Sequence, residues 1–103
     1  MDQIERIKYY ENLLNEASAV LKDFDKAFDA YIAVQGKISE LDVYYASPEW
    51  KEDFEASEKG SLPEGLLCGV LSEDGIDHVL DDNLHLFAQC KMIEEILKKH
   101  FQR

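Results

Sequence analysis

Cysteine, proline, basic residues and long apolar runs are all scarce in this chain of 103 residues. Cys68 and Cys90 form no CxxC motif, so neither a disulfide framework nor a zinc knuckle is indicated, and we expect free, buried thiols. No stretch approaches the roughly 18 consecutive apolar residues of a membrane span. The N-terminus lacks the basic start and apolar run of a signal peptide, so we expect a cytoplasmic protein.

The scarcity of basic residues excludes two classes of partner. Eleven lysines and arginines stand against 22 acidic residues, and the formal net charge is −11. Nucleic-acid binding and docking on an anionic membrane both need a basic surface, so we expect neither. Hydrophobic residues make up 46% of the chain, which is enough for a core. The length then predicts a single domain over residues 1–103.

The negative charge is unevenly placed. Residues 1–39 hold seven acids and five bases, and residues 83–103 hold two acids and four bases. Residues 40–82, here called the acidic segment, hold thirteen acids and only two bases, a net charge of −11. The whole excess of negative charge therefore lies in the middle of the chain.

The N-terminal part of the chain has the apolar period of a helix. Apolar residues recur at alternating spacings of three and four, interrupted only by Gln35 and Asp42. The positions are Ile7, Tyr10, Leu14, Ala17, Leu21, Phe24, Phe28, Tyr31, Gln35, Ile38, Asp42 and Tyr45. Asp2 is a candidate N-cap. We predict a helix over residues 3–45, with a possible break at Gly36 because glycine disfavours a helix interior.

Two further helices are predicted. Ser47 and Pro48 form a typical helix start, followed by a short helix over residues 48–58 that buries Trp50 and Phe54. Residues 59–72 form a glycine-containing loop whose apolar residues we expect to enter the core; these are Leu62, Leu66, Leu67, Val70 and Leu71. A last helix over residues 73–101 starts after Ser72, and its seam consists of Ile76, Val79, Leu80, Asn83, Leu86, Phe87, Cys90, Ile93 and Leu97.

The element lengths predict an all-α architecture. The short and C-terminal helices together nearly match the long N-terminal helix, at about 1.5 Å per residue. We therefore expect the long N-terminal helix to pack antiparallel against the other two, as a helical hairpin or small bundle. The apolar stripe of the first helix is wider than one neighbour covers, so we also expect a homodimer.

Two kinds of site are considered for the polar residues. On the last helix, Asp74, His78, Asp82 and His85 follow one another on one face and are suitable ligands for a transition metal. One helix face rarely closes a first shell, and no second ligand motif completes the site, so an exposed polar face is the preferred interpretation. No cofactor is predicted. Nucleophilic catalysis finds no support, because no serine or cysteine has a histidine at a suggestive spacing.

The acidic segment has more carboxylates than helix capping requires. Confinement of the negative charge to one segment favours a surface that binds a basic protein, although solvation of a charged loop accounts for part of this charge. The candidate partner-binding residues are Glu49, Glu52, Asp53, Glu73 and Asp74. We predict a protein-interaction or regulatory module without catalysis. The alternative is a divalent-metal protein that uses helix carboxylates and histidines; a nucleic-acid mimic ranks third, because the acids span several elements.

Several strings in the middle of the chain resemble one bacterial family. They are the YY-x-S-x-EW pattern at Tyr44–Trp50 and the GVLSED string at Gly69–Asp74, with Asp82-Asn83 beyond them and Ile4-Glu5-Arg6-Ile7 before. Nearly the full chain is similar to the family called domain of unknown function 4298. The resemblance implies a stand-alone protein, mostly from Gram-positive bacteria. It brings no catalytic residues with it.

Overall fold

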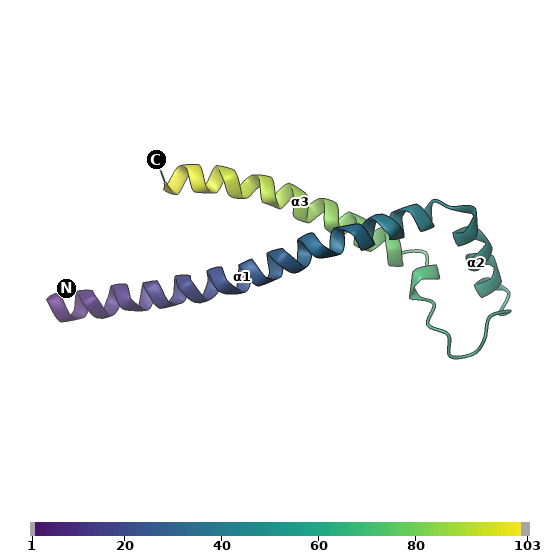
Figure 1. Ribbon diagram of the computed structural model, residues 1–103, viewed down its shortest axis with the longest axis horizontal. Coiled ribbons are helices and arrows are strands. Elements are labelled where there is room, and N and C mark those ends of the chain that lie inside the picture. The colour runs from purple at the N-terminus through teal and green to yellow at the C-terminus, as the bar shows by residue number, and fades with distance from the viewer. Residues whose placement is uncertain (1, 102–103) are drawn as a thin grey trace. The chain divides into compact units, whose positions relative to one another are not determined.

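The computed structural model describes residues 2–101 and consists of helices joined by a tight turn after α1 and a long connection after α2 (Figure 1). The elements are α1 (Gln3–Tyr45), α2 (Pro48–Glu58), the 3-10 helix η1 (Gly69–Leu71) and α3 (Gly75–His100). The described residues contain no strand, and the structure is 83% helical. The predicted all-α class, with long helices at both ends and a short one between them, is confirmed.

Helix α1 begins at a side-chain cap and runs without interruption. Asp2 Oδ1 accepts a hydrogen bond from the Glu5 backbone N–H at 2.8 Å, which satisfies one of the donors that a helix start leaves free. The helix passes through Gly36, so the possible break there does not occur. Gly36 does mark the boundary between two compact units, residues 1–36 and residues 37–103.

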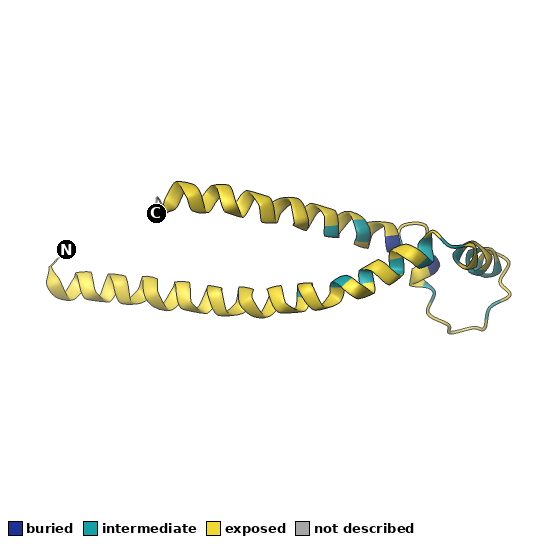
Figure 2. Ribbon diagram, turned by 45° about the horizontal axis from the view of Figure 1, so that its top comes forward, coloured by how far each residue is buried: buried dark blue, intermediate teal, exposed yellow. Residues whose placement is uncertain are grey.

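The first unit is the N-terminal part of α1 by itself. Because a single helix has no second element to pack on within this unit, its apolar residues other than Tyr31 remain exposed, and Figure 2 shows this part of α1 mostly in the colour of exposed residues. Leu14 is 64% exposed, Leu21 67% and Phe24 54%. The apolar residues whose 3–4 spacing predicted the helix therefore lie on an exposed face. A soluble protein rarely leaves an apolar helix face of this kind uncovered.

The second unit contains the last turns of α1, the turn at Ala46–Ser47, α2, η1 and α3. Ser47 closes α1 and opens α2: its hydroxyl donates to the Tyr44 carbonyl at 2.6 Å and accepts from the Trp50 N–H at 3.3 Å. Pro48 occupies the first helical position, where its missing N–H costs nothing. The predicted helix start is thus confirmed.

The connection between α2 and α3 is built on two turns with positive φ and on η1. Gly60 and Gly65 adopt φ of 69° and 83°, a backbone conformation that residues with a Cβ rarely adopt. Helix η1 contacts both α2 and α3. The expectation that the apolar loop residues enter the core is wrong for Leu66, Leu67 and Val70, which are exposed by 54%, 92% and 37%. Leu66 and Leu67 lie in the irregular part of the connection before η1, which offers them no packing surface.

Helix α3 begins at Gly75, slightly later than the sequence predicted. Ser72 holds this start: its hydroxyl donates to the Gly69 carbonyl at 2.8 Å and accepts from the Gly75 N–H at 3.0 Å. The backbone of Asp74 occupies the N-cap position, but its carboxylate makes no capping hydrogen bond. Ser72 therefore performs the capping role predicted for it, three residues ahead of the helix.

The core of the second unit is small and lies where η1 meets the start of α3. Leu71 and Ile76 are buried, with 7% and 3% of their surface exposed, and Figure 2 shows the buried colour only in this region. Leu80 and Asn83, on the next turns of α3, are half-buried. The expected burial of both cysteines is wrong: Cys68 is half-buried and Cys90 is exposed.

Candidate functional site

The junction of α1 and α2 is fixed by one side-chain hydrogen bond. The Tyr44 hydroxyl donates to Asp53 Oδ2 at 2.6 Å, joining the last turn of α1 to the middle of α2. This hydrogen bond, with burial and the negative charge of Asp53, raises the pKa of Tyr44 to about 12. Asp53 was predicted as a partner-binding residue, and the structure shows its carboxylate engaged inside the protein.

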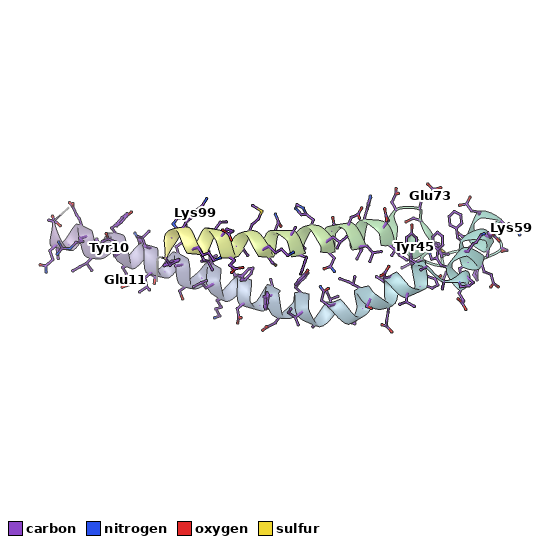
Figure 3. All side chains as sticks on the ribbon, turned by 90° about the horizontal axis from the view of Figure 1, so that it is seen from above. Tyr10, Glu11, Tyr45, Lys59, Glu73 and Lys99 are labelled. Atoms are coloured by element: carbon purple, nitrogen blue, oxygen red, sulfur yellow. The ribbon has the colours of Figure 1, made fainter. Side chains whose placement is uncertain are left out.

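An aromatic cluster packs beside this junction. The Trp50 ring stacks on Phe54 with centroids 5.2 Å apart, and Tyr45 meets Trp50 edge-on at 4.9 Å. The Trp50 indole N–H donates to the Val70 carbonyl at 2.9 Å, so the same side chain ties α2 to η1. Figure 3 shows Tyr45 among the side chains at this end of the second unit. The cluster therefore links α2 to the end of α1 and to η1, all within the acidic segment.

The other predicted partner-binding carboxylates are exposed. Glu49 lies in the first turn of α2, and Glu52 lies on the following turn. Glu73 and Asp74 precede α3, and Figure 3 shows the Glu73 side chain on the outside of the second unit. The structure therefore places these acids at two places on the surface rather than in one cavity.

A shallow groove lies beside Glu49. It has a volume of about 430 Å³, is open to solvent, and is lined by Ser39, Glu40, Val43, Tyr44, Ser47 and Glu49. Val43 supplies apolar surface, being 69% exposed, while Glu40 and Glu49 supply carboxylates. The groove thus combines a hydrophobic contact with negative charge, although nothing encloses it.

Few of the charges on the described residues are paired. The ion pairs formed within residues 2–101 both belong to Lys98, which lies 3.5 Å from Glu94 and 3.6 Å from Glu95 on the exposed side of α3. No carboxylate of the acidic segment takes part in one. Apart from Asp53, which is half-buried and accepts the Tyr44 hydrogen bond, the carboxylates of that segment are exposed to solvent.

The candidate metal ligands do not form a metal centre. Asp74, His78, Asp82 and His85 are all exposed. Across the described part of the chain, no group of three or more histidine, cysteine, aspartate or glutamate side chains is arranged to hold a metal ion. Their helical spacing places them on successive turns of one face of α3.

Sequence reasoning missed two side-chain contacts, one at the α1–α2 junction and one on α3. The Tyr44–Asp53 hydrogen bond joins residues on different helices, so no periodicity within one helix predicts it. The Lys91 ammonium lies 5.0 Å from the centroid of the Phe87 ring, a cation–π contact one turn apart on α3. Only the i, i+4 spacing of the latter pair was a usable signal.

Two further findings concern membrane spanning and the family of the chain. Within residues 2–101, no helix is both long and apolar enough to cross a membrane. A family model, DUF4298, described as a domain of unknown function, matches residues 7–98. The chain belongs to this family. The DUF4298 match includes α2, the connection and most of α1 and α3, so the strings at Tyr44–Trp50, Gly69–Asp74 and Asp82-Asn83 lie inside it, whereas Ile4, Glu5 and Arg6 precede it. No curated protein and no solved structure matches the chain.

Proposed function

We propose that this DUF4298 protein is a cytoplasmic protein-interaction module without catalysis, whose acidic segment binds a basic surface of a partner protein. One observation supports the proposal: the carboxylates of the acidic segment other than Asp53 are exposed, and none of the segment's carboxylates forms an ion pair within the described residues. A charge of −11 confined to 43 residues repels itself, and a cationic partner relieves that repulsion.

The groove beside Glu49 suits one basic side chain of such a partner. The aliphatic stem of a lysine or arginine would lie on Val43, and its charged group would meet Glu40 or Glu49. Charge complementarity of this kind accelerates association and selects the partner more than it adds to affinity. The complex is therefore expected to weaken as ionic strength rises, since the Debye length is about 8 Å at physiological salt.

Affinity capture with matched charge variants tests the proposal. The segment variant carries Glu49→Gln, Glu52→Gln, Glu73→Gln and Asp74→Asn. The control variant neutralises the same number of exposed acids on α1 through Glu11→Gln, Glu16→Gln, Asp25→Asn and Asp29→Asn. We expect the wild type and the control variant to retain the same protein from lysate of the native cells at low salt. The segment variant is expected to lose it.

Two results contradict the proposal. The first is retention of the same proteins by the segment variant and the control variant, which would place binding elsewhere. The second is a wild-type protein that retains nothing in a salt-dependent manner. Circular dichroism of each variant shows whether the helices are intact, so that loss of binding is not confused with unfolding.

A further inference from the structure

The apolar surface of α1 within residues 4–34 has two unlike sides. Its seam repeats at alternating spacings of three and four and consists of Ile7, Tyr10, Leu14, Ala17, Leu21, Phe24, Phe28 and Tyr31. One side of the seam, called here the apolar flank, carries Arg6, Leu13, Val20, Ala27 and Val34. The other side, called the mixed flank, carries Ile4, Glu11, Ser18, Asp25 and Ile32. The seam and its flanks cover nearly half of the helix circumference and are together called the α1 stripe.

The α1 stripe by itself offers the apolar area of a stable interface. Eleven of its large apolar side chains are exposed, by 38–67%. Complete burial of such a side chain removes roughly 60–120 Å² from water, so these exposed fractions amount to roughly 350–700 Å² per chain. A standard interface takes about 800 Å² from each partner, and about two-thirds of that area, roughly 500 Å², is apolar in homodimers. The stripe therefore reaches this area without any other surface of the chain.

The unlike flanks select an antiparallel partner. When two helices pack in parallel along such a seam, the flank on one side faces the opposite flank of the other helix, which would put Val20 against Asp25 of the partner subunit. In an antiparallel pair each flank faces its own counterpart, so Leu13 and Val20 meet apolar residues, while Glu11 and Asp25 stay at the solvent-exposed edge. One surface then serves both copies, as a two-fold interface requires.

The sizes of the seam residues select the register. If the two-fold axis lies at the level of Ala19, residues whose numbers add to about 38 lie opposite each other. Every opposed pair of the seam is then apolar, and the pairs are Ile7–Tyr31, Tyr10–Phe28, Leu14–Phe24 and Ala17–Leu21. Small residues meet larger ones, which is how facing helices fill the space between them.

A groove on α1 fits the same register. It has a volume of about 500 Å³, is open to solvent, and is lined by Leu13, Glu16, Ala17, Val20 and Leu21. Four of these residues follow the i, i+3, i+4, i+7 pattern of a hole that receives a knob from a facing helix. The short side chain of Ala17 lies in the middle of that pattern. Leu21 of the partner subunit lies opposite Ala17 and would fill the groove.

The flanks also match their own reversed copy. On the apolar flank, Leu13 comes opposite Ala27 of the partner subunit. On the mixed flank, Ile4 comes opposite the partner's Ile32, and both are exposed in the single chain, by 60% and 56%. These two isoleucines are the apolar residues of an otherwise polar flank, and they would cover each other. A stripe that matches itself in this way points to a second copy as its occupant.

The charges of the stripe oppose this register only weakly. Glu11 comes opposite Asp25 of the partner subunit, twice by symmetry, and Arg6 comes opposite the partner's Val34. These positions are exposed, where water and salt screen the repulsion between two carboxylates. The seam pairs, by contrast, remove large apolar side chains from water. Burial along the seam therefore outweighs the like-charge contact at its edge.

The remaining charges of residues 4–34 lie further from the seam. One position beyond the flanks, the opposed pairs are Lys8–Asp29, which attract, and Glu16–Asp23, which repel. Glu5 and Lys26 lie on the opposite face of α1. At these separations the screening length of about 8 Å leaves each contribution small.

We propose that the α1 stripe binds the α1 stripe of a second copy of this chain, antiparallel, with the two-fold axis at the level of Ala19. The surface lies within residues 4–34, whereas the carboxylates assigned to the basic partner lie within residues 40–82. The dimer strengthens as ionic strength rises, because salt screens its like-charge edge, whereas the complex with the basic partner weakens. Either inference can therefore fail without the other.

Sedimentation equilibrium of the wild type and two matched variants tests the surface. Leu21→Asp puts a charge in the seam beside the axis, whereas Ala19→Asp puts the same charge at nearly the same level on the opposite face of α1. We expect a dimer for the wild type and for Ala19→Asp. Leu21→Asp is expected to raise the dimer Kd at least about tenfold, because its carboxylate would be buried without a partner.

A charge exchange tests the register. At low salt, Glu11→Lys or Asp25→Lys alone is expected to lower the dimer Kd about three- to tenfold, because each converts two like-charge contacts into ion pairs. The double variant Glu11→Lys/Asp25→Lys opposes two lysines and is expected to return to within about threefold of the wild type. A general effect of net charge would instead tighten the dimer further in the double variant, which is the least negative of the three.

Distances between spin labels test the orientation without altering the stripe. In a Cys68→Ser/Cys90→Ser background, one label at a time replaces a polar residue one position beyond the mixed flank; the residues are Lys8, Asn15, Lys22 and Asp29. Along the helix axis, the two labels of a dimer are expected to lie about 30 Å apart at positions 8 and 29 and about 10 Å apart at positions 15 and 22. A parallel dimer would give four equal distances. Double electron–electron resonance measures them.

Four outcomes overturn the inference. A wild type that is monomeric at all concentrations removes the second copy as the occupant of the stripe. Equal Kd values for Leu21→Asp and Ala19→Asp would place self-association on another surface. Four equal label distances would exclude the antiparallel orientation. A double charge variant that dimerises more tightly than both single variants would exclude the register.

Discussion

Tyr44 has a structural role within the acidic segment that was considered for partner binding. Its hydroxyl lies 2.6 Å from Asp53, and the resulting rise of its pKa to about 12 means that the neutral phenol is favoured in the folded state. Asp53 is therefore better understood as an acceptor that orients α2 than as a free charge. The neighbouring Trp50 has a similar role, because its indole N–H holds the Val70 carbonyl of η1.

Replacement of Tyr44 by phenylalanine removes this hydrogen bond without removing the ring. We expect Tyr44→Phe to lower the free energy of unfolding at pH 7 by about 1–2 kcal/mol, because the Asp53 carboxylate loses its donor in a half-buried place. Denaturant unfolding at fixed protein concentration measures the change. Tyr9→Phe, at an exposed residue of α1, is the control and should change little. Equal effects of the two substitutions would show that the hydrogen bond contributes nothing.

The pH dependence of this pair has a defined sign. The folded-state pKa of Tyr44, about 12, lies above the ordinary value of 10.0. The hydrogen bond therefore stabilises the fold fully below pH 10 and is lost as the pH rises through 12. The difference in tyrosinate absorbance between wild type and Tyr44→Phe should titrate near pH 12. In an Asp53→Asn background the same difference should titrate at lower pH; an unchanged midpoint would contradict the assignment.

At the scale of elements, helix boundaries depend on serine hydroxyls more than on the acids around them. Ser47 both ends α1 and caps α2, and Ser72 holds the start of α3 from η1. Glu49 and Asp74 lie at the two helix starts, but Asp74 makes no capping hydrogen bond. Their charge is thus largely free for interactions outside the chain.

Loss of the Ser47 cap is expected to be measurable. Ser47→Ala should destabilise the protein by about 1 kcal/mol, since the Trp50 N–H and the Tyr44 carbonyl both lose a partner. Ser18→Ala, in the exposed middle of α1, should be neutral or slightly stabilising because alanine has the higher helix propensity. Thermal unfolding followed by circular dichroism compares the two. If the Ser47 cap stabilises the fold, Ser47→Ala must unfold at a lower temperature than Ser18→Ala.

Two glycines in helices should respond oppositely to alanine. At Gly75 an added Cβ would clash with the Gly69 carbonyl oxygen and lie 2.7 Å from Ser72 Oγ, so Gly75→Ala should cost about 1–3 kcal/mol. At Gly36 nothing lies within 4 Å, so Gly36→Ala should stabilise α1 by about 0.5–1 kcal/mol. Chemical unfolding of both variants at one protein concentration tests the contrast. Stabilisation by Gly75→Ala would mean that η1 does not approach α3 as described.

For the whole molecule, the scarcity of buried residues is the dominant fact. Only Leu71 and Ile76 are buried among the described residues, although 46% of the sequence is hydrophobic. Hydrophobic burial is the main favourable term in folding, so a chain that leaves most of its apolar side chains in water is marginal by itself. We expect association with a second copy, as predicted from the width of the apolar stripe of α1, to bury part of this surface.

Coupling of folding to association has a thermal signature. We expect the unfolding midpoint to rise by roughly 3 °C for each tenfold increase in protein concentration, since dimerisation adds about 1.4 kcal/mol per decade to a unit of about 200 residues. Differential scanning calorimetry over two decades of concentration measures the slope. A midpoint independent of concentration in the wild type would argue for a stable monomer.

The sequence by itself determined the helices and the uneven charge. Local signals carried both: the 3–4 apolar spacing, the Ser47-Pro48 start, the Ser72 cap and the confinement of acids to residues 40–82 depend only on residues close in the chain. The YY-x-S-x-EW and GVLSED strings likewise sufficed to identify the family.

Tertiary structure alone decided which of these residues are available. Asp53 is engaged by Tyr44, Leu67 lies outside the core and Cys90 is exposed, because burial depends on what other elements supply and not on a residue's own neighbours in sequence. The same holds for the candidate metal ligands, which form no group able to hold a metal ion among the described residues. Periodicity predicts an apolar face, but only the arrangement of elements determines whether that face is covered or free.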